Sequence, residues 1–214
     1  MDYRPSRPHT VGRQIASPAP SPVKIIIAGG FGAGKTTFVG TVSEIPPLTT
    51  EAALTSASLG IDDTSQVGAK TTTTVAMDFG RITLLDSVIL YLFGTPGQDR
   101  FWFMWDELVL GAIGAIVLVD TRRLADSFPA VDYFEERDIP FLVAVNRFEG
   151  AREYRLDEVR NALDVDPRRP IIFCDARRRE SVRQALVALV RHSLDVVTSE
   201  EAQRGLPRAN TRVD

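Results

Sequence analysis

Between residues 29 and 36 the chain reads Gly29-Gly30-Phe31-Gly32-Ala33-Gly34-Lys35-Thr36. This stretch matches the pattern G-x-x-x-x-G-K-[ST] of a phosphate-binding loop, the P-loop. The glycines let the backbone turn tightly so that its N–H groups face phosphate oxygens, and a helix beginning at Lys35 adds its positive end. We expect the Lys35 ammonium to bind the β- and γ-phosphates of a nucleotide and the Thr36 hydroxyl to coordinate Mg²⁺.

The sequence around this loop predicts an α/β domain. Residues 23–28 are apolar and β-branched, as in a buried parallel strand, and residues 35–44 suit a helix. The runs 74–84 and 88–93 are separated by a short turn, as in a hairpin. Beyond them the expected strands are 115–119, 141–145 and 171–173, and the expected helices are 99–110, 124–136, 156–163 and 180–197. This alternation predicts a mostly parallel six-stranded sheet with one antiparallel pair and helices on both faces.

Three other segments carry no such pattern. Residues 1–22 are rich in proline and serine, which is typical of a disordered tail. The domain is expected to cover residues 23–198, and residues 199–214 to form a second, flexible tail. Residues 48–70 are small and polar, and we expect a long loop there that is functional or partly disordered.

Composition excludes several classes of function. The net charge of −3 argues against a broad nucleic-acid surface. The sequence predicts no signal peptide and no lipidation motif, and it contains no apolar run of about 18 residues that would span a membrane. The single cysteine, Cys174, lies in an apolar run and is expected to be a buried thiol. We therefore expect a cytoplasmic protein without a direct membrane anchor, which a partner could recruit to a membrane.

Two further motifs distinguish among P-loop proteins. Residues 94–101 read Gly94-Thr95-Pro96-Gly97-Gln98-Asp99-Arg100-Phe101, which resembles the D-T-A-G-Q-E-R-F of switch II in Ras- and Rab-type GTPases. Residues 74–79 read Thr74-Val75-Ala76-Met77-Asp78-Phe79, which resembles the T-x-x-x-D-F of switch I and its strand. Over about residues 23–197 the chain is similar to the actinobacterial conservon-type small GTPases, which are encoded with roadblock-type partners. It is more distantly similar to bacterial Mgl-type polarity GTPases.

The resemblance implies a Ras-like G domain that binds Mg²⁺ with GTP or GDP. Thr36 and Thr74 would hold the metal, and Gln98 would orient the attacking water in a site that also contains Lys35. Thr37 would complete the nucleotide-binding set of the P-loop.

Switch II departs from the family pattern at its first residue. Gly97, later in the motif, would contact the nucleotide. Gly94 replaces the aspartate that normally holds Mg²⁺ through water. The loss of that aspartate predicts weaker Mg²⁺ binding or a ligand from elsewhere in the chain. Asp86 and Asp120 are possible substitutes, although a turn residue and a helix cap are their simpler interpretations.

Two loops are candidates for recognition of the base. Asn146-Arg147-Phe148-Glu149 stands where the family has N-K-x-D. Glu149 keeps the carboxylate that accepts hydrogen bonds from guanine, one methylene further out, and Arg147 would lie against the base or the P-loop. Asp175-Ala176-Arg177 stands where the family has S-A-K, with the Ala176 N–H facing guanine O6. The alternatives are a solvated acid at Glu149 and an ordinary loop at 175–177.

The segment after Arg100 is rich in large apolar residues: Phe101, Trp102, Phe103, Met104 and Trp105. They cannot all face one core across a helix, so some should be exposed in at least one nucleotide state. We expect a partner surface that uses Phe101, Trp102 and Trp105; the alternative is a doubly buried helix start. The resemblance implies a roadblock/longin-type regulator as the partner.

The expected activity is slow GTP hydrolysis by a molecular switch. Some Mgl-type relatives use an arginine near switch I as an internal finger, but residues 41–70 contain none, which leaves Arg81 and Arg100 as alternatives. A partner would then be needed to accelerate hydrolysis. Two other functions stay open. One is a nucleotide-gated scaffold with little turnover, favoured by Gly94 and Glu149, and the other is an ATP-using P-loop enzyme.

Overall fold

The protein is described by a computed structural model that covers residues 20–46, 48–54, 73–84, 87–97 and 99–205, with the backbone alone for 48–54, 73–76, 99–100 and 203–205. Its strands are β1 (Ser21–Ala28), β2 (Leu48–Leu54), β3 (Thr73–Leu84), β4 (Val88–Gly94), β5 (Ala112–Val119), β6 (Phe141–Asn146) and β7 (Ile171–Cys174). Its α-helices are α1 (Lys35–Val42), α2 (Trp105–Val109), α3 (Phe128–Glu136), α4 (Leu156–Leu163) and α5 (Arg179–Gly205). Two 3₁₀ helices, η1 (Asp99–Met104) and η2 (Thr121–Ser127), precede α2 and α3.

The strands form one sheet in the order β2-β3-β4-β1-β5-β6-β7. The five strands from β4 to β7 are parallel, and β3 is antiparallel to both of its neighbours. β1 therefore lies in the middle of the sheet, and the P-loop leaves its carboxyl end. This is the edge of an open parallel sheet at which ligands bind. The predicted mostly parallel α/β architecture is confirmed.

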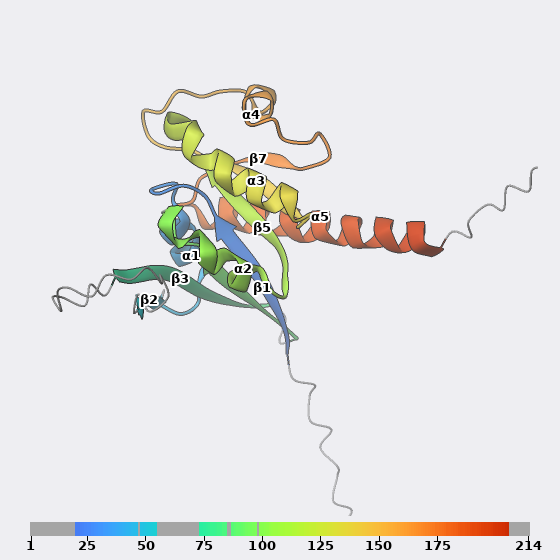
Figure 1. Ribbon diagram of the computed structural model, residues 1–214, viewed down its shortest axis with the longest axis horizontal. Helices are drawn as coiled ribbons and strands as arrows, with labels where there is room; N and C mark the ends of the chain where they lie inside the picture. The colour runs from blue at the N-terminus through green and yellow to red at the C-terminus, as the bar shows by residue number, and fades with distance from the viewer. Residues whose placement is uncertain (1–19, 47, 55–72, 85–86, 98, 206–214) are drawn as a thin grey trace, which may run out of the picture.

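The helices cover both faces of the sheet, and α3 and α5 lie on opposite sides of it (Figure 1). The alternation along β1 explains the two layers. Ile25 and Ile27 pack in the apolar cluster that includes residues of α1 and α5, whereas Ile26 and Ala28 pack in the cluster that includes residues of α2, α3 and α4. All four side chains are fully buried, which explains why this part of β1 is a continuous apolar run instead of an alternation of apolar and polar residues.

The structure differs from the prediction at the outer edge of the sheet. Residues 48–54, expected to lie in a loop, form β2, which pairs with β3 from Leu48 opposite Phe79 to Leu54 opposite Thr73. The sheet therefore has seven strands, and β3 makes two antiparallel pairs instead of one. An edge strand is held by backbone hydrogen bonds, which leave no apolar pattern in the sequence.

Several element ends also differ from the prediction. β1 begins at Ser21, which pairs with Val88, so it takes in two residues assigned to the N-terminal tail. α5 continues to Gly205, past the predicted end near residue 197. The added residues include Glu200, Glu201 and Ala202, which favour helix. Cys174 is buried, as predicted, with 1% of its surface exposed.

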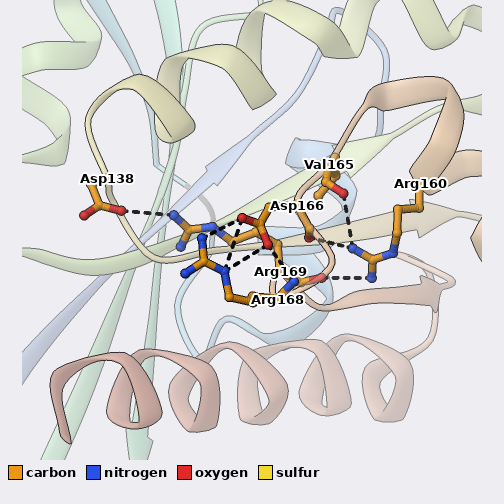
Figure 2. A network of polar contacts seen from close by, with 6 residues as sticks. All are labelled: Asp138, Arg160, Val165, Asp166, Arg168 and Arg169. Atoms are coloured by element: carbon orange, nitrogen blue, oxygen red, sulfur yellow. Dashed lines mark hydrogen bonds and ion pairs between the residues drawn. The ribbon is translucent and has the colours of Figure 1, made fainter. Parts of the chain in front are cut away.

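Arginine side chains fix the turn between α4 and β7 (Figure 2). Arg160 donates to the carbonyl oxygens of Asp166, at 2.7 Å, and Arg169, at 2.9 Å. Arg168 forms an ion pair of 2.7 Å with Asp166, and this hydrogen bonding holds the pKa of the Asp166 carboxyl well below its usual range. Arg169 reaches Asp138, beyond the end of α3, at 3.3 Å. The network therefore supports the start of β7, the strand that leads into the 175–177 loop.

Candidate nucleotide-binding site

The P-loop adopts a backbone that only glycine accommodates without strain. Gly29, Gly32 and Gly34 have φ values of +136°, +76° and +104°. A Cβ at Gly29 would lie 2.3 Å from the carbonyl oxygen of Leu118 on β5, so the loop also packs against the sheet. α1 follows with no side-chain cap at its N-terminus and no acidic residue in its first turn. The N–H groups of that first turn are therefore not taken by a capping side chain, as an anion site requires.

Lys35 is folded back over the loop that precedes it. Its Nζ donates to the carbonyl oxygens of Gly29, at 2.8 Å, and Gly30, at 2.7 Å, and only 8% of the residue is exposed. Burial lowers the pKa of Lys35 from 10.5 to about 8, and the negative charge of Asp78 opposes this shift. Within the part of the chain that the structure describes, the ammonium is bonded to carbonyl oxygens and to no anion, and a buried cation of this kind favours an anionic ligand.

Asp78 is the functional candidate that the sequence analysis missed. The Thr36 hydroxyl donates to its Oδ2 at 2.8 Å. The antiparallel register that pairs Phe79 with Phe93 brings Asp78 beside Gly94, and a Cβ at Gly94 would lie 3.0 Å from the same oxygen. The carboxylate absent from β4 at position 94 is thus supplied by the neighbouring strand. The sequence held one clue, an acid and a glycine at matching positions of a predicted hairpin.

The side chains of the two switch residues with predicted roles, Thr74 in metal binding and Gln98 in catalysis, lie outside the described atoms. Thr74 lies in β3, where its backbone pairs with Ala53, but its side chain is outside the described atoms. Gln98 falls outside the described residues. Gly97 is described, and a Cβ there would lie 2.7 Å from Lys35 Nζ and 3.1 Å from the backbone of Phe31. The start of switch II therefore lies directly against the P-loop.

A cavity of about 400 Å³ opens beside this contact, lined by Gly30, Phe31, Gly97, Arg123, Ala125, Asp126 and Pro129. Arg123 comes from η2, where its φ of −140° and ψ of 53° interrupt the helix. Its guanidinium forms an ion pair of 2.6 Å with Asp126. A cation from the segment after β5 therefore lies at the mouth of the P-loop. The sequence analysis, which considered Arg81 and Arg100, did not identify Arg123.

Asn146 joins the phosphate and base sides of the site. It is 5% exposed at the end of β6. Its Nδ2 donates to the Ala33 carbonyl oxygen at 2.9 Å, and its Oδ1 accepts the N–H of Ala176 at 3.0 Å. A Cβ at Gly34 would lie 2.5 Å from Nδ2, so the glycine is needed for this contact. The Ala176 N–H, expected to face guanine O6, instead donates to Asn146 because both groups are buried at the same point.

Arg147, Glu149 and Arg177, on the base side, are exposed, whereas Asp175 is partly buried. The Arg147 guanidinium lies 4.7 Å from the centre of the Phe173 ring, and Arg177 binds Asp175 at 2.9 Å. Hydrogen bonding to Asp175 raises the pKa of Arg177, with a smaller contribution from the charge of Glu149. Glu149 is exposed, and its carboxylate lies close enough to Arg177 to affect the pKa of the guanidinium.

Asp120 caps η2 rather than facing the phosphate loop. Its Oδ1 accepts the N–H of Arg122 at 3.0 Å, and its carboxylate binds the guanidinium of the same residue at 2.7 Å. Arg122 in turn lies over the Phe148 ring, 3.8 Å from its centre. The capping interpretation of Asp120 is therefore confirmed. Asp86, the other acid considered, lies outside the described residues.

The aromatic segment after switch II is mostly buried. Trp105 is 1% exposed, stacks on Trp102 with ring centres 5.2 Å apart, and meets Tyr133 edge-on at 5.0 Å. Phe101 is 6% exposed, whereas Phe103 is 61% exposed. Two of the three residues expected to face a partner, Phe101 and Trp105, are thus core residues here, because the helical turns direct them toward the sheet. The exposed aromatic residue of this segment is Phe103, and Trp102 beside it is half-buried.

A family model described as "conserved hypothetical ATP binding protein" matches residues 27–196. The chain belongs to this family. It is also 29% identical over 127 residues to an uncharacterized protein of Methanocaldococcus jannaschii, an alignment that covers 58% of this chain and 70% of that protein.

Two solved G domains resemble this member of the ATP-binding-protein family. The G domain of the T. maritima FeoB iron transporter has a TM-score of 0.57 and 16% identity, with 81% of this chain and 99% of that chain covered. The FeoB G-domain of Methanococcus jannaschii has a TM-score of 0.53 and 12% identity, with 80% and 97% covered. The predicted P-loop NTPase architecture with a G-domain fold is thereby confirmed. Among the helices of the described residues, none is long and apolar enough to cross a bilayer.

Proposed function

We propose that this member of the ATP-binding-protein family is a guanine-nucleotide switch that binds Mg²⁺ with GTP or GDP and hydrolyses GTP slowly. The observation that carries the proposal is the hydrogen bond from Thr36 to Asp78 at the end of a glycine-shaped P-loop. It places a metal-binding hydroxyl, a carboxylate and the buried Lys35 ammonium around one point at the carboxyl edge of the sheet. Such a grouping suits a metal–triphosphate ligand.

The residues around Thr36 fit Mg²⁺, which prefers hard oxygen ligands. Thr36 would bind the metal directly through Oγ1, and Asp78, already 2.8 Å from that oxygen, would hold the metal's water ligands and orient the hydroxyl. Thr74 is the residue of switch I that we propose as a second ligand of the metal. When bound, the metal would neutralise charge that develops between the β- and γ-phosphates. Asp78 thus takes the place of the aspartate that the sequence lacks at Gly94.

Hydrolysis would use few groups of this chain. A water oxygen attacks the γ-phosphorus, the bond to the β–γ bridging oxygen breaks, GDP leaves with the electron pair, and the proton of the water ends on phosphate. Gln98 is proposed to orient the water, and Lys35 to hold the phosphates. Arg123, at the rim of the P-loop cavity, is the internal cation that we propose to face the γ-phosphate. Its ion pair with Asp126 competes with that role, and this favours a slow intrinsic rate.

Guanine is favoured over adenine by the loop after β6. Asn146 fixes the positions of the P-loop and the 175–177 loop relative to each other. Glu149, on the exposed rim, supplies the carboxylate that would accept the N–H groups of guanine, whereas adenine lacks both of these donors. The family description favours ATP as the second candidate. A scaffold that binds nucleotide without turnover is the third.

We also propose that a roadblock/longin-type regulator contacts the switch II side. Phe103 and Trp102 line a cavity of about 490 Å³ against α3, together with Asp106, Asp132, Glu136 and Arg137, and Arg137 pairs with Asp106 at 3.0 Å and with Glu136 at 3.8 Å. The exposed aromatic ring would anchor the partner, and the Asp132 carboxylate would favour a basic side chain opposite it. This surface replaces the one centred on the buried Phe101 and Trp105.

Calorimetric titration of the nucleotide-free chain with GDP and with ADP, both in Mg²⁺, tests the proposal. Tight GDP binding with no detectable ADP binding is expected. Equal or tighter ADP binding would refute guanine recognition by residues 146–149 and make an ATP-using enzyme the better interpretation. Binding of GDP without turnover of GTP, measured by phosphate release, would identify the scaffold instead.

A further inference from the structure

α5 carries a second apolar stripe that does not pack on the sheet. Its inner face is formed by Val182, Ala185 and Leu189, each with no exposed surface. Beside that face lie the residues that we call the outer seam, Val187, Val190, Leu194 and Val197, which are spaced three, four and three residues apart; of these four, Val190 also packs against the apolar cluster between α5 and the sheet. This is the spacing with which one α-helix packs against another.

The outer seam is exposed along most of its length. Val187 is 42% exposed, Leu194 61% and Val197 51%, while Val190 is partly buried. Figure 1 shows why, since the C-terminal turns of α5 run past the sheet with none of the other described helices or strands alongside. Each of these side chains would be worth about 1–2 kcal/mol if it were transferred from water into an apolar contact. The pattern therefore indicates a surface that another helix covers.

The seam begins at a groove between α5 and the β3–β4 hairpin. This cavity has a volume of about 610 Å³, and its walls include Ile82, Leu84 and Leu90 from the hairpin. Leu84 is 42% exposed. The groove continues the seam at its N-terminal end and offers apolar contact to the end of a helix that lies along α5.

The charges beside the seam determine which helix fits. Arg183 lies just before the seam and Glu201 just after it, and both are exposed. Arg183 has only a long contact, 3.9 Å, with Glu180 of its own helix. The seam therefore has a basic end and an acidic end. A partner helix must present the same two charges in the opposite direction, and α5 of a second copy does so when it runs antiparallel.

We propose that two copies of this chain associate through antiparallel α5 helices. When Val187 of one copy faces Val197 of the second, Val190 faces Leu194, and Arg183 faces Glu201. All of these contacts occur twice, as in a two-fold symmetric interface. A parallel arrangement would bring Arg183 against Arg183. The seam is short, so we expect a reversible monomer–dimer equilibrium rather than a permanent dimer.

Sedimentation equilibrium of the full chain over a range of concentrations tests the association. A concentration-dependent dimer is expected, and Leu194→Glu should make the chain monomeric by placing a charge in the middle of the seam. Leu110→Glu is the matched control, because Leu110 is 65% exposed and lies between α2 and β5, outside the seam. A wild-type chain that stays monomeric up to about 1 mM, or a dimer that survives Leu194→Glu, would overturn the proposal.

A charge reversal tests the antiparallel register. Arg183→Glu and Glu201→Arg should each weaken the dimer about 3- to 10-fold, because each turns both ion pairs into like-charge contacts. The double variant should restore the affinity to within about 2-fold, since the pairs re-form with exchanged charges. A double variant no tighter than the single ones would refute this register. GDP affinity, measured in parallel, should be unchanged in every variant, which keeps this test independent of the proposed switch function.

Discussion

The two ends of the candidate nucleotide site are built differently. At the phosphate end, the cation that would meet the ligand is buried, since Lys35 is 8% exposed, and the exposed Thr36 is held by its hydrogen bond to the half-buried Asp78 on β3. At the base end, Arg147, Glu149 and Arg177 are exposed; Arg147 pairs with the exposed Glu153, and Arg177 pairs with the partly buried Asp175. Asn146 is the buried residue that connects the two ends.

This difference indicates which property of the site is robust. The buried Lys35 has one position in its close-packed loop, and Asp78 holds the Thr36 hydroxyl, so recognition of phosphate is fixed by the fold itself. Exposed carboxylates and guanidiniums change partners at a cost of about 1 kcal/mol or less. The base preference should therefore be the weaker and more easily altered property. The predictions that follow test that contrast, in order of decreasing effect.

Removal of the buried cation should have the largest effect. Lys35→Ala should lower GDP and GTP affinity by about 100-fold or more, because the phosphates lose a charge-assisted partner in a desolvated site. Lys24→Ala is the control, because Lys24 is another lysine, on β1, and its Nζ donates to the carbonyl oxygen of Leu110 instead of to the P-loop. The measurement is calorimetric titration. Retained affinity in Lys35→Ala would mean that residues 29–36 do not form the phosphate site.

Relocation of the carboxylate should reveal the role of Asp78. Asp78→Gly should raise the Mg²⁺ concentration needed for tight GTP binding by about 10- to 100-fold. Gly94→Asp alone should destabilise the protein, because its Cβ would lie 2.9 Å from the Asp78 Cβ. The double variant should recover Mg²⁺ dependence, since it returns one acid to the same space. If the double variant binds Mg²⁺ no better than Asp78→Gly, the carboxylate has no role in the metal site.

The affinity for nucleotide should depend on pH through Lys35. Its pKa in the free protein is about 8, and bound phosphate raises it because the anion favours the ammonium. Below pH 8 the lysine is charged in the free and in the nucleotide-bound protein, so the affinity for nucleotide does not change with pH. Above pH 8 the free protein loses the proton and must regain it on binding, so affinity falls about tenfold per pH unit. Lys35→Arg should abolish this slope, because guanidinium does not titrate there; an unchanged slope would assign it to another group.

Arg123 should affect turnover but not binding. Arg123→Ala is expected to slow single-turnover GTP hydrolysis about tenfold, well below the ~1,000-fold of a fully engaged arginine finger, because Asp126 holds the guanidinium. Asp126→Asn should raise the rate by releasing it. GDP affinity serves as the control measurement. Equal hydrolysis rates in all three proteins would exclude Arg123 from the reaction.

The base end should respond least. Glu149→Asp is expected to tighten GDP binding about threefold, because the carboxylate returns to the position that guanine requires, and to leave ADP binding unchanged. Glu153→Asp, a neighbouring exposed acid that contacts Arg147 at 3.8 Å, is the matched control. For each variant, competition titrations of GDP against ADP measure the affinities for the two nucleotides. If Glu149→Asp alters neither affinity, Glu149 lies outside the base site.

Much of this protein could be predicted from local patterns. The P-loop, the order of strands and helices, the buried Cys174 and the capping role of Asp120 all follow from residue types at short spacing. The edge strand β2 could not be predicted in this way, because backbone pairing with β3 needs no apolar pattern in residues 48–54. The burial of Phe101 and Trp105 was equally out of reach, since five apolar residues in a row do not show which of them face the sheet.

The sequence by itself determined that this chain folds around a P-loop at the end of a central strand, because glycine spacing and apolar runs act over a few residues. Only the tertiary structure decided which groups meet there. Asp78 lies 42 residues from Thr36, and Arg123 comes from a segment after β5, so neither could be assigned by local spacing. Sheet register and helix packing bring them to the P-loop, since contacts between distant segments depend on how layers pack rather than on neighbouring residues.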